Sequence, residues 1–233
     1  MSMRLTPHRF VAANPIGVDW VCGDLHGEFE SLQSSLSCAG FNKTVDRLFL
    51  LGDTIDRGPE SRALLEWVLA TEWVHSVIGN HELMFIAGAE DTGSRYKHRG
   101  MGGDWVASLD EASYQSLATR CRYQLPLTIT LECEKGYLGL VHAQSPFDDW
   151  RTVQGSPFSE RFAIECTWPW SRAQRADHTI SGISAVVSGH IGTAEIVQKG
   201  NQLWIDTLAK TGQVPLMPVH QVLDRVAKVP RNE

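Results

Sequence analysis

Residues that can bind metal ions or transfer protons recur in this sequence directly after short apolar runs. They stand in five motifs: Gly23-Asp24-Leu25-His26-Gly27, Gly52-Asp53-Thr54-Ile55-Asp56-Arg57-Gly58, Gly79-Asn80-His81-Glu82, Val141-His142-Ala143 and Ser188-Gly189-His190. Carboxylate, amide and imidazole ligands without a thiolate suit Mn²⁺, Mg²⁺, Fe or Zn²⁺ rather than copper or a structural zinc. A single carboxylate has two oxygens and can bridge two cations about 3.5–4 Å apart. Each motif alone is typical of an ordinary turn, but five in one chain predict a metal site.

Parallel strands would bring the first three motifs together. The apolar runs at 18–22, 48–51 and 73–78 are typical of short buried strands, and leucines at helical spacing lie between them. We expect one helix to stop at Gly40 and the next to begin with Pro59 at its first position. This order predicts parallel strands joined by right-handed crossovers. Ligands of such open α/β sheets bind at the carboxyl ends of the strands, where these motifs stand.

The rest of the chain is expected to complete one domain over residues 1–233. Its middle, 91–122, is polar, glycine-containing and weakly helical, and we interpret it as a small helical insertion or cap. Further strands are expected at these places: 125–133 paired with 137–141, 185–187, and a hairpin of 195–199 and 202–206.

Composition excludes several classes of protein. The chain has 233 residues, 42% hydrophobic and 21% charged, with a net charge of −6, so we expect a globular protein without a broad nucleic-acid-binding surface. No run approaches the ~20 apolar residues of a membrane span, and the first fourteen residues do not resemble a signal peptide. The five cysteines are scattered, which favours reduced thiols and a cytoplasmic location. The oligomeric state is left open.

Taken together, the first three motifs resemble the signature blocks of the serine/threonine phosphoprotein phosphatase (PPP) family. The resemblance is to its small bacterial and phage type, like lambda phosphatase, within the calcineurin-like metallophosphoesterase superfamily. It extends from about Trp20 to Asp206 and is strongest over the first third of the chain. It implies an α/β fold in which helices flank a central β-sandwich, with a dinuclear site at one edge.

The resemblance also implies an activity and the residues that serve it. The expected reaction is hydrolysis of phosphoserine or phosphothreonine, and also phosphotyrosine, in proteins or peptides by a hydroxide that bridges two metal ions. Mn²⁺ is the expected metal, with Fe, Zn²⁺ or Mg²⁺ as alternatives. The implied metal ligands are Asp24 and His26 for the first ion, Asp53 for both, and Asn80, His142 and His190 for the second. The other implied roles are His81 as general acid, Asp56 as the residue that orients it, Arg57 as a phosphate clamp, and Arg172, with Arg175 as fallback, as the second clamp.

Two other functions share most of these residues. A symmetrical dinucleoside polyphosphate hydrolase of the same superfamily would keep the metal ligands, but that group tends to lack the counterparts of Asp56 and Glu82. A non-catalytic binding module on the same fold would usually have lost ligands, whereas every expected position is filled here. Both alternatives are ranked below a phosphoprotein phosphatase.

A third alternative is a cysteine-dependent phosphatase, because Cys166 and Arg172 have the Cys-x₅-Arg spacing. Such a loop wraps backbone N–H groups around phosphate beside a low-pKa thiolate. The five intervening residues include a proline, two tryptophans and no glycine, so we interpret the spacing as a coincidence. Trp105 is a candidate for the border of the substrate cleft. The histidines outside the motifs are expected to be surface or structural residues: His8, His75, His98, His178 and His220.

Overall fold

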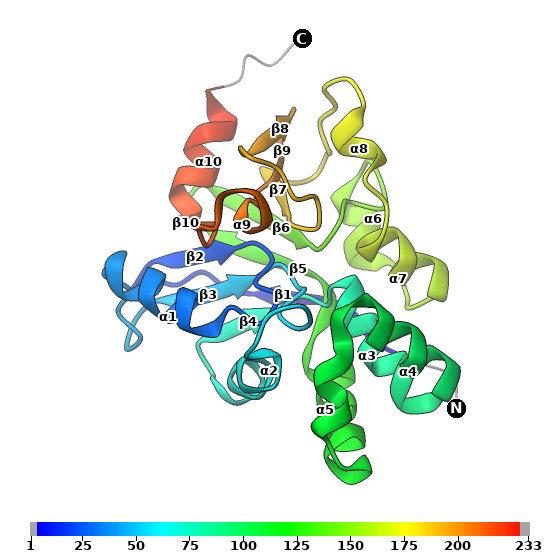
Figure 1. Cartoon of the computed structure of the whole chain (residues 1–233). Coiled ribbons are helices and arrows are strands. Elements are labelled where there is room, and N and C mark those ends of the chain that lie inside the picture. The colour runs from blue at the N-terminus through cyan, green and yellow to red at the C-terminus, as the bar shows by residue number, and fades with distance from the viewer. Residues whose placement is uncertain (1–3, 229–233) are drawn as a thin grey trace.

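The computed structural model describes residues 4–228 and forms two β-sheets flanked by helices (Figure 1). The strands are β1 (Thr6–Val11), β2 (Asp19–Cys22), β3 (Arg47–Leu50), β4 (Val74–Ser76), β5 (Pro126–Cys133), β6 (Gly136–Val141), β7 (Ala185–Ser188), β8 (Val197–Lys199), β9 (Gln202–Trp204) and β10 (Leu216–Pro218). The smaller sheet has the order β10-β2-β3-β4, and the larger has the order β1-β5-β6-β7-β9-β8. β2, β3 and β4 run parallel, as the sequence predicted.

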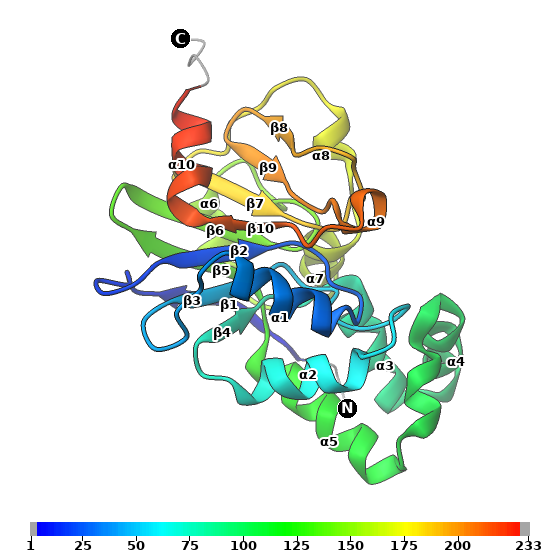
Figure 2. The ribbon, with the colours of Figure 1, turned by 60° about the vertical axis from the view of Figure 1, so that its left-hand side comes forward.

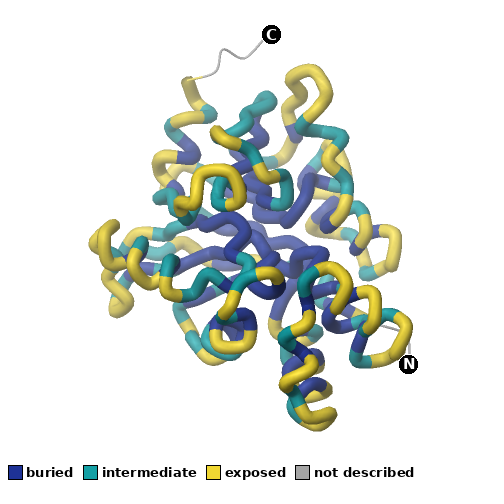
Figure 3. Tube along the Cα trace, viewed as in Figure 1, coloured by how far each residue is buried: buried dark blue, intermediate teal, exposed yellow. Residues whose placement is uncertain are grey.

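The two sheets pack against each other because side chains alternate along each strand. In the smaller sheet, Val21 and Phe49 join the core between the sheets, while their neighbours Cys22, Leu48 and Leu50 join a second core under the helices. The larger sheet contributes alternate residues of β5 and β6 to the inner core: Ile129, Leu131, Leu138 and Leu140. Figure 3 shows this central region as buried and most of the exposed segments in the surrounding helices and loops. The predicted α/β fold with a central β-sandwich is confirmed.

Helices cover the outer sides of the sheets (Figure 2). They are α1 (Phe29–Cys38), α2 (Ser61–Ala70), α3 (Asn80–Glu90), α4 (Thr92–His98), α5 (Glu111–Gln124), α6 (Trp150–Gly155), α7 (Glu160–Thr167), α8 (Ser171–Gln174), α9 (Leu208–Thr211) and α10 (Val219–Ala227). Helices α1 and α2 lie along the smaller sheet, and α6 and α7 contact the larger one. Within residues 4–228, no helix is both long enough and apolar enough to span a membrane.

The predicted start of α2 was wrong. The helix begins at Ser61, not at Pro59. The backbone N–H of Glu60 donates to the carbonyl of Gly27, at 3.1 Å, and the N–H of Gly58 donates to the carbonyl of His26, at 2.9 Å. Residues 56–60 are therefore bound to the first motif as a loop before the helix begins.

Two strands were not predicted from the sequence. β1 contains Pro7 and alternates weakly, and it gains its place by parallel pairing with β5 about 120 residues further along the chain. β10 is three residues long and ends at Pro218, and it pairs antiparallel with β2. Both strands lie at a sheet edge, where proline is tolerated because it need not donate to a further strand.

The segment 91–122 is helical through most of its length. It contains α4, a π-helical turn η1 (Arg99–Gly103), a 3₁₀ turn η2 (Asp104–Ser108) and most of α5. Helix α5 buries four side chains in the core under the helices: Tyr114, Leu117, Ala118 and Cys121. This segment is therefore continuous with the packing of the rest of the chain. Its interpretation as an insertion or cap within one domain stays a prediction.

Candidate metal centre

The backbone of the predicted site is unusual. A non-glycine residue rarely adopts a positive φ, and such strain persists chiefly where the surrounding structure enforces it. Within residues 4–228, every non-glycine residue with positive φ belongs to the predicted set: His26 (44°), Asp53 (48°), Asp56 (74°), Arg57 (69°) and His190 (67°). The strand-to-helix turns after β2 and β3 and the turn after β7 thus direct these side chains to a common place.

Two groups of possible metal ligands share one aspartate. His26, Asp53 and His81 form the first, and Asp53, His142 and His190 form the second, with ligand atoms within 4.8 Å of one another in each. Asp53 Oδ2 lies 3.9 Å from His26 Nε2 and 3.5 Å from His142 Nε2. A carboxylate between two clusters of donors is the arrangement that a bridging ligand requires.

Hydrogen bonds to the backbone set which nitrogen each histidine presents. His26 Nδ1 donates to the carbonyl of Ile55 at 3.1 Å, and His142 Nδ1 donates to that of Leu51 at 2.7 Å. The Nε2 lone pairs therefore face Asp53, as second-sphere bonds of this kind do in metal sites. His190 is oriented the opposite way, because its Nε2 lies 2.9 Å from the carbonyl of Trp168 and leaves Nδ1 for the centre.

The contact between Asn80 and His142 also fits a cation. Asn80 Oδ1 lies 2.9 Å from His142 Nε2. With the hydrogen of His142 on Nδ1, both of these atoms are acceptors, and two facing acceptors are expected of two ligands of one cation. Burial lowers the pKa of His142 to about 4, so the imidazole is neutral and able to bind a metal near pH 7.

Three buried acids lie near one another in the centre: Asp24, Asp53 and Asp206. Burial, then the nearby charges of Asp206 and Asp53, raise the pKa of Asp24 well above its ordinary value. Burial and Asp53 raise the pKa of Asp206 to about 6, and its Oδ1 is buried without a hydrogen-bond partner among residues 4–228. Divalent cations would relieve this repulsion, so the residues fit such ions on electrostatic grounds as well as by donor type.

Asp206 was not among the predicted site residues. It follows β9 as the other aspartates follow β2 and β3, so its place after a strand was the available signal. Asp24, which the resemblance implies as a ligand of the first ion, lies beside His26 and His190: its Oδ1 accepts from the backbone N–H of His190 at 2.9 Å, and its Oδ2 lies 4.0 Å from His26 Nε2.

Glu82 holds the backbone of the second motif in place through hydrogen bonds. Its carboxylate accepts hydrogen bonds from the backbone N–H groups of Asp53 (2.8 Å), Thr54 (2.8 Å) and Gly79 (2.9 Å), and from the Thr54 hydroxyl (2.8 Å). The residue is fully buried, and burial followed by the charge of Asp53 raises its pKa. Glu82 therefore fixes the backbone that carries Asp53 to the start of α3.

A histidine–aspartate pair lies beside the shared aspartate. His81 Nδ1 is 2.6 Å from Asp56 Oδ2, and His81 Nε2 is 3.9 Å from Asp53 Oδ2. Burial alone would lower the pKa of His81, but the bond to Asp56 and the charge of Asp53 outweigh it and raise the pKa. The exposed Arg57 donates to both His26 Nε2 (2.8 Å) and His81 Nε2 (3.0 Å) and so stands between the centre and solvent.

His98 and Trp105 join this pair. His98 was expected to be a surface or structural residue, and it is the second: it is fully buried, and its Nε2 lies 3.0 Å from Asp56 Oδ1 and 2.8 Å from Oδ2. Trp105 Nε1 donates to Asp56 Oδ1 at 2.7 Å. Its place at the border of the substrate cleft stays a prediction.

Arg172 is occupied elsewhere. Its guanidinium donates to the carbonyl of Ser145 at 2.7 Å and pairs with Asp148 Oδ1 at 2.7 Å. Among residues 4–228, no contact joins it to the metal-ligand groups directly; its backbone N–H instead donates to Gln144 Oε1, two residues beyond His142. Its assignment as the second clamp, with the exposed Arg175 as fallback, stays a prediction.

The cysteine alternative is wrong. Cys166 lies inside α7 rather than on a loop, and its thiol is fully buried. Burial raises the pKa of that thiol well above its ordinary value. Because the thiolate is the nucleophile in such phosphatases, Cys166 cannot serve this chemistry.

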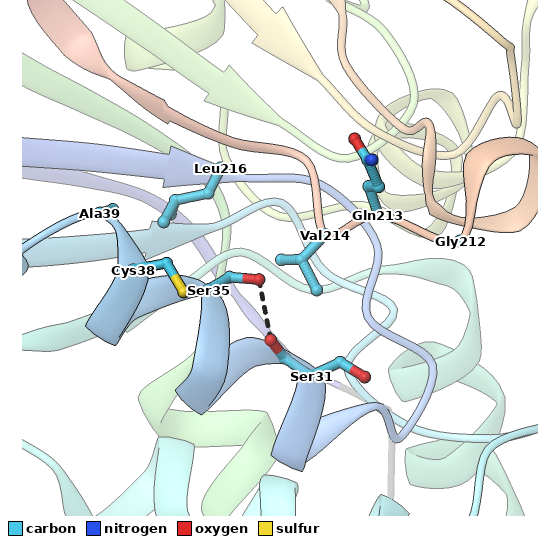
Figure 4. Close-up of a pocket in the computed structure, with 8 residues that line it drawn as sticks. All are labelled: Ser31, Ser35, Cys38, Ala39, Gly212, Gln213, Val214 and Leu216. Atoms are coloured by element: carbon cyan, nitrogen blue, oxygen red, sulfur yellow. Dashed lines mark hydrogen bonds between the residues drawn. The ribbon is translucent and has the colours of Figure 1, made fainter.

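A surface hollow lies away from the centre, between α1 and the segment 212–216 (Figure 4). Its lining includes Ser31, Cys38, Gln213 and Leu216 and carries no charged side chain. It lacks the charges that a phosphate group needs, so the strand-end centre is the better candidate for a phosphoester site.

Known proteins resemble this chain over most or part of its length. Residues 20–193 match the family described as calcineurin-like phosphoesterase. The chain is 34% identical over 194 residues to serine/threonine-protein phosphatase 2 of Escherichia coli K12, covering 81% of this chain and 86% of that protein. It is 38% identical over 79 residues to a symmetrical bis(5'-nucleosyl)-tetraphosphatase of Chromobacterium violaceum, covering 34% and 28% of the two chains. The solved structure of a proposed diadenosine tetraphosphatase matches the fold with a TM-score of 0.57 at 17% identity, covering 91% of this chain and 97% of that one.

Proposed function

This chain belongs to the calcineurin-like phosphoesterase family, and from that membership we propose that it is a metal-dependent phosphoprotein phosphatase. Its substrates are phosphoserine and phosphothreonine in proteins or peptides, with phosphotyrosine as a further candidate. The observation that carries this proposal is the buried pair of His81 and Asp56, 2.6 Å apart, beside the shared Asp53.

The leaving group explains why that pair matters. A departing serine or threonine oxygen is strongly basic and needs a proton as its bond to phosphorus breaks. A departing nucleotide phosphate is weakly basic and leaves without one. A histidine whose raised pKa comes from a buried aspartate therefore suits a phosphomonoester better than a dinucleoside polyphosphate.

The candidate ligands would hold two divalent cations. The proposed sets are Asp24, His26 and Asp53 for one ion, and Asp53, Asn80, His142 and His190 for the other. Mn²⁺ is our first choice, with Fe, Zn²⁺ and Mg²⁺ as alternatives, because the ligands are carboxylate, amide and neutral imidazole. When bound, such ions supply an activated water and positive charge for the phosphate oxygens.

The remaining steps belong to side chains of the chain. Arg57 can donate two hydrogen bonds from one planar group, which suits a pair of phosphate oxygens. His81 Nε2 accepts a hydrogen bond from Arg57 in this structure, and once Arg57 binds phosphate instead, Nε2 can carry the proton to the leaving oxygen. Asp56 holds His81 Nδ1 and stabilises the protonated ring, so that a proton is available on Nε2 before the bond breaks.

A second candidate is the symmetrical hydrolysis of dinucleoside tetraphosphates. It is supported by the 38% identity to the C. violaceum enzyme, although that similarity covers 34% of this chain. The two activities share their metal ligands, so they must be separated by substrate. We also propose a reducing, cytoplasmic environment, because Cys22, Cys121 and Cys166 are buried thiols.

The test removes metal with a chelator, restores Mn²⁺, and assays a phosphoserine peptide beside diadenosine tetraphosphate. We expect Mn²⁺-dependent release of phosphate from the peptide. Cleavage of the dinucleotide alone would establish the second candidate. If the protein binds Mn²⁺ and turns over neither substrate, a binding module on this fold becomes the better reading.

A further inference from the structure

We propose that His98 and Trp105 are positioning residues that hold the Asp56 carboxylate in line with His81. This inference rests on the proposed function, because it concerns the proton that His81 gives to the leaving group. It assigns a role to the segment 91–122, which carries both residues from a distant part of the chain to the buried side of the pair.

The contacts to Asp56 come from three side chains. His81 Nδ1 and His98 Nε2 reach its Oδ2 at 2.6 and 2.8 Å, and Trp105 Nε1 reaches its Oδ1 at 2.7 Å. The backbone N–H of Asp56 donates to Ser61 Oγ at 2.9 Å. With both oxygens bonded and the backbone fixed, the carboxylate plane cannot turn away from His81 without breaking a bond.

The other nitrogen of His98 indicates the direction of this contact. His98 Nδ1 is buried and has no hydrogen-bond partner among residues 4–228. A hydrogen on Nδ1 would be a buried donor without an acceptor, which is costly. The hydrogen therefore belongs on Nε2, where it points at Asp56.

The backbone around His98 is adapted to this arrangement. A side chain at Gly103 would come within 2.5 Å of the His98 ring. Gly102 has a φ of 105°, and its carbonyl accepts from the backbone N–H of Arg57 at 3.0 Å. The small residues at 102 and 103 thus let this turn approach both His98 and the loop that carries Asp56.

Aromatic packing holds the two donors in place. The ring of Phe85 on α3 lies 5.4 Å from the Trp105 ring and 5.8 Å from the His98 ring, between centroids. Phe85 is four residues after His81 and therefore on the same side of that helix. His81 is thus on the same helix as Phe85, the residue that the rings of His98 and Trp105 contact.

These donors have a chemical consequence. Burial alone would raise the pKa of Asp56, but the hydrogen bonds from His81, His98 and Trp105 outweigh it and hold the pKa below its ordinary value. An aspartate that is ionised and fixed keeps the His81 hydrogen on Nδ1 and the transferable proton on Nε2. A carboxylate free to rotate would do this less often.

The experiment compares substrates that differ in their need for an acid. We would make His98→Leu, His98→Gln and Trp105→Phe in the full chain and measure kcat with a phosphoserine peptide and with 2,4-dinitrophenyl phosphate. Removing a partner of this kind is expected to cost about 10- to 100-fold on the peptide. The loss on 2,4-dinitrophenyl phosphate should stay below about 3-fold, because its leaving group departs without a proton.

Two variants serve as controls. His98→Gln keeps an N–H at the position of Nε2 and should recover most of the loss seen in His98→Leu. Trp150→Phe removes the same kind of buried bond, from Trp150 Nε1 to Thr130 Oγ1 at 2.7 Å, away from Asp56. It should lower the turnover of both substrates equally or not at all. Bound Mn²⁺ is measured for every variant, to exclude loss of metal.

Equal losses on both substrates in His98→Leu and Trp105→Phe would overturn the inference and leave these residues a structural role. Unchanged turnover of the peptide would overturn it as well. A wild-type protein inactive on both substrates would instead contradict the proposed function. In that case the proton between His81 and Asp56 is followed by NMR, where a strongly downfield signal should be lost in His98→Leu and kept in Trp150→Phe. Its persistence in His98→Leu would overturn the inference independently of activity.

Discussion

Asp24 and Asp56 are both buried aspartates of one centre, yet the protein surrounds them in opposite ways. Asp24 lies with Asp206 and Asp53, and burial together with these like charges raises its pKa well above the ordinary value. Asp56 receives hydrogen bonds from three side chains, which outweigh burial and hold its pKa below the ordinary value. The neighbours of Asp24 disfavour its ionised form, whereas the neighbours of Asp56 stabilise its ionised form.

This difference in pKa divides the residues of the centre into two groups, which we call the metal-ligand side and the acid side. The candidate metal-ligand side consists of Asp24, His26, Asp53, Asn80, His142, His190 and the neighbouring Asp206. The acid side consists of Asp56, His81, His98 and Trp105, of which His81 also stands in the first group of possible ligands. The first brings like charges together and would be completed by cations, whereas the Asp56 carboxylate of the second is already bonded by side chains of the protein. Loss of metal should therefore disturb one side and leave the other intact.

The largest effect is expected from Asp53→Asn. Asp53 is the one residue shared by both ligand groups, so the substitution should lower metal content and reduce kcat/KM on a phosphoserine peptide by about 10³-fold or more. Bound metal is measured by mass spectrometry beside the kinetics. Asp19→Asn, which alters an aspartate paired with Arg47 outside the centre, is the matched control and should keep its metal. If Asp53→Asn still bound Mn²⁺ fully, the assignment of Asp53 to a separate metal-ligand side would be wrong.

The next effect is expected from Asp56→Asn, on the other side. General-acid catalysis typically contributes about 10²- to 10⁴-fold, so peptide turnover should fall by about that amount. Metal content should stay at the wild-type level, because Asp56 has no place in either ligand group. The loss on 2,4-dinitrophenyl phosphate should be much smaller. If Asp56→Asn lost metal as readily as Asp53→Asn, the metal-ligand side and the acid side would not be separate.

The two sides also differ in how far they could be predicted from the sequence. The metal-ligand side follows from local signals, because each predicted residue stands directly after an apolar run, and parallel strands bring such positions together. Asp206 carried the same signal at the end of 202–206, but no Gly-Asp motif drew attention to it.

His98 and Trp105 carried no local signal. They are 42 and 49 residues from Asp56 along the chain, in a weakly helical segment whose apolar residues show no clear period. Their place depends on packing around Phe85 and on the close approach of Gly102 and Gly103. The same reason applies to β1, because its partner strand β5 lies about 120 residues further along the chain. The spacing of apolar residues along the sequence does not predict tertiary contacts of this kind.

A smaller effect is expected on the stability of the metal-free protein. The pKa of Asp206 is raised in the folded state from 3.8 to about 6, so the folded protein holds its proton more tightly than the unfolded chain. This contribution to stability is present below pH 4 and is lost as the pH rises through about 6. Asp206→Asn cannot ionise, and it should therefore exceed the metal-free wild type by about 2–3 kcal/mol in free energy of unfolding at pH 8.

Urea denaturation of both proteins, with chelator present, measures that difference. Comparing the two at each pH cancels the contribution of buried histidines such as His142, which acts in the opposite direction. The gain should vanish toward pH 4 and should shrink or reverse with saturating Mn²⁺, because cations then relieve the same repulsion. A gain that is the same at pH 4 and pH 8 would show that the pKa of Asp206 is not raised in the folded state.

The smallest effect is expected at the edge of the centre, from Asp148→Asn. Asp148 is 69% exposed by side chain and binds the guanidinium of Arg172, and exposed ion pairs of this kind are worth little. Releasing Arg172 should make it available to phosphate and lower KM for the phosphoserine peptide by about two- to threefold, with kcat unchanged. Arg172→Ala should raise KM whether or not Asp148 is present, if Arg172 is the second clamp. If neither substitution changes KM, Arg172 only supports the loop after His142, and phosphate binding depends on Arg57 and the cations.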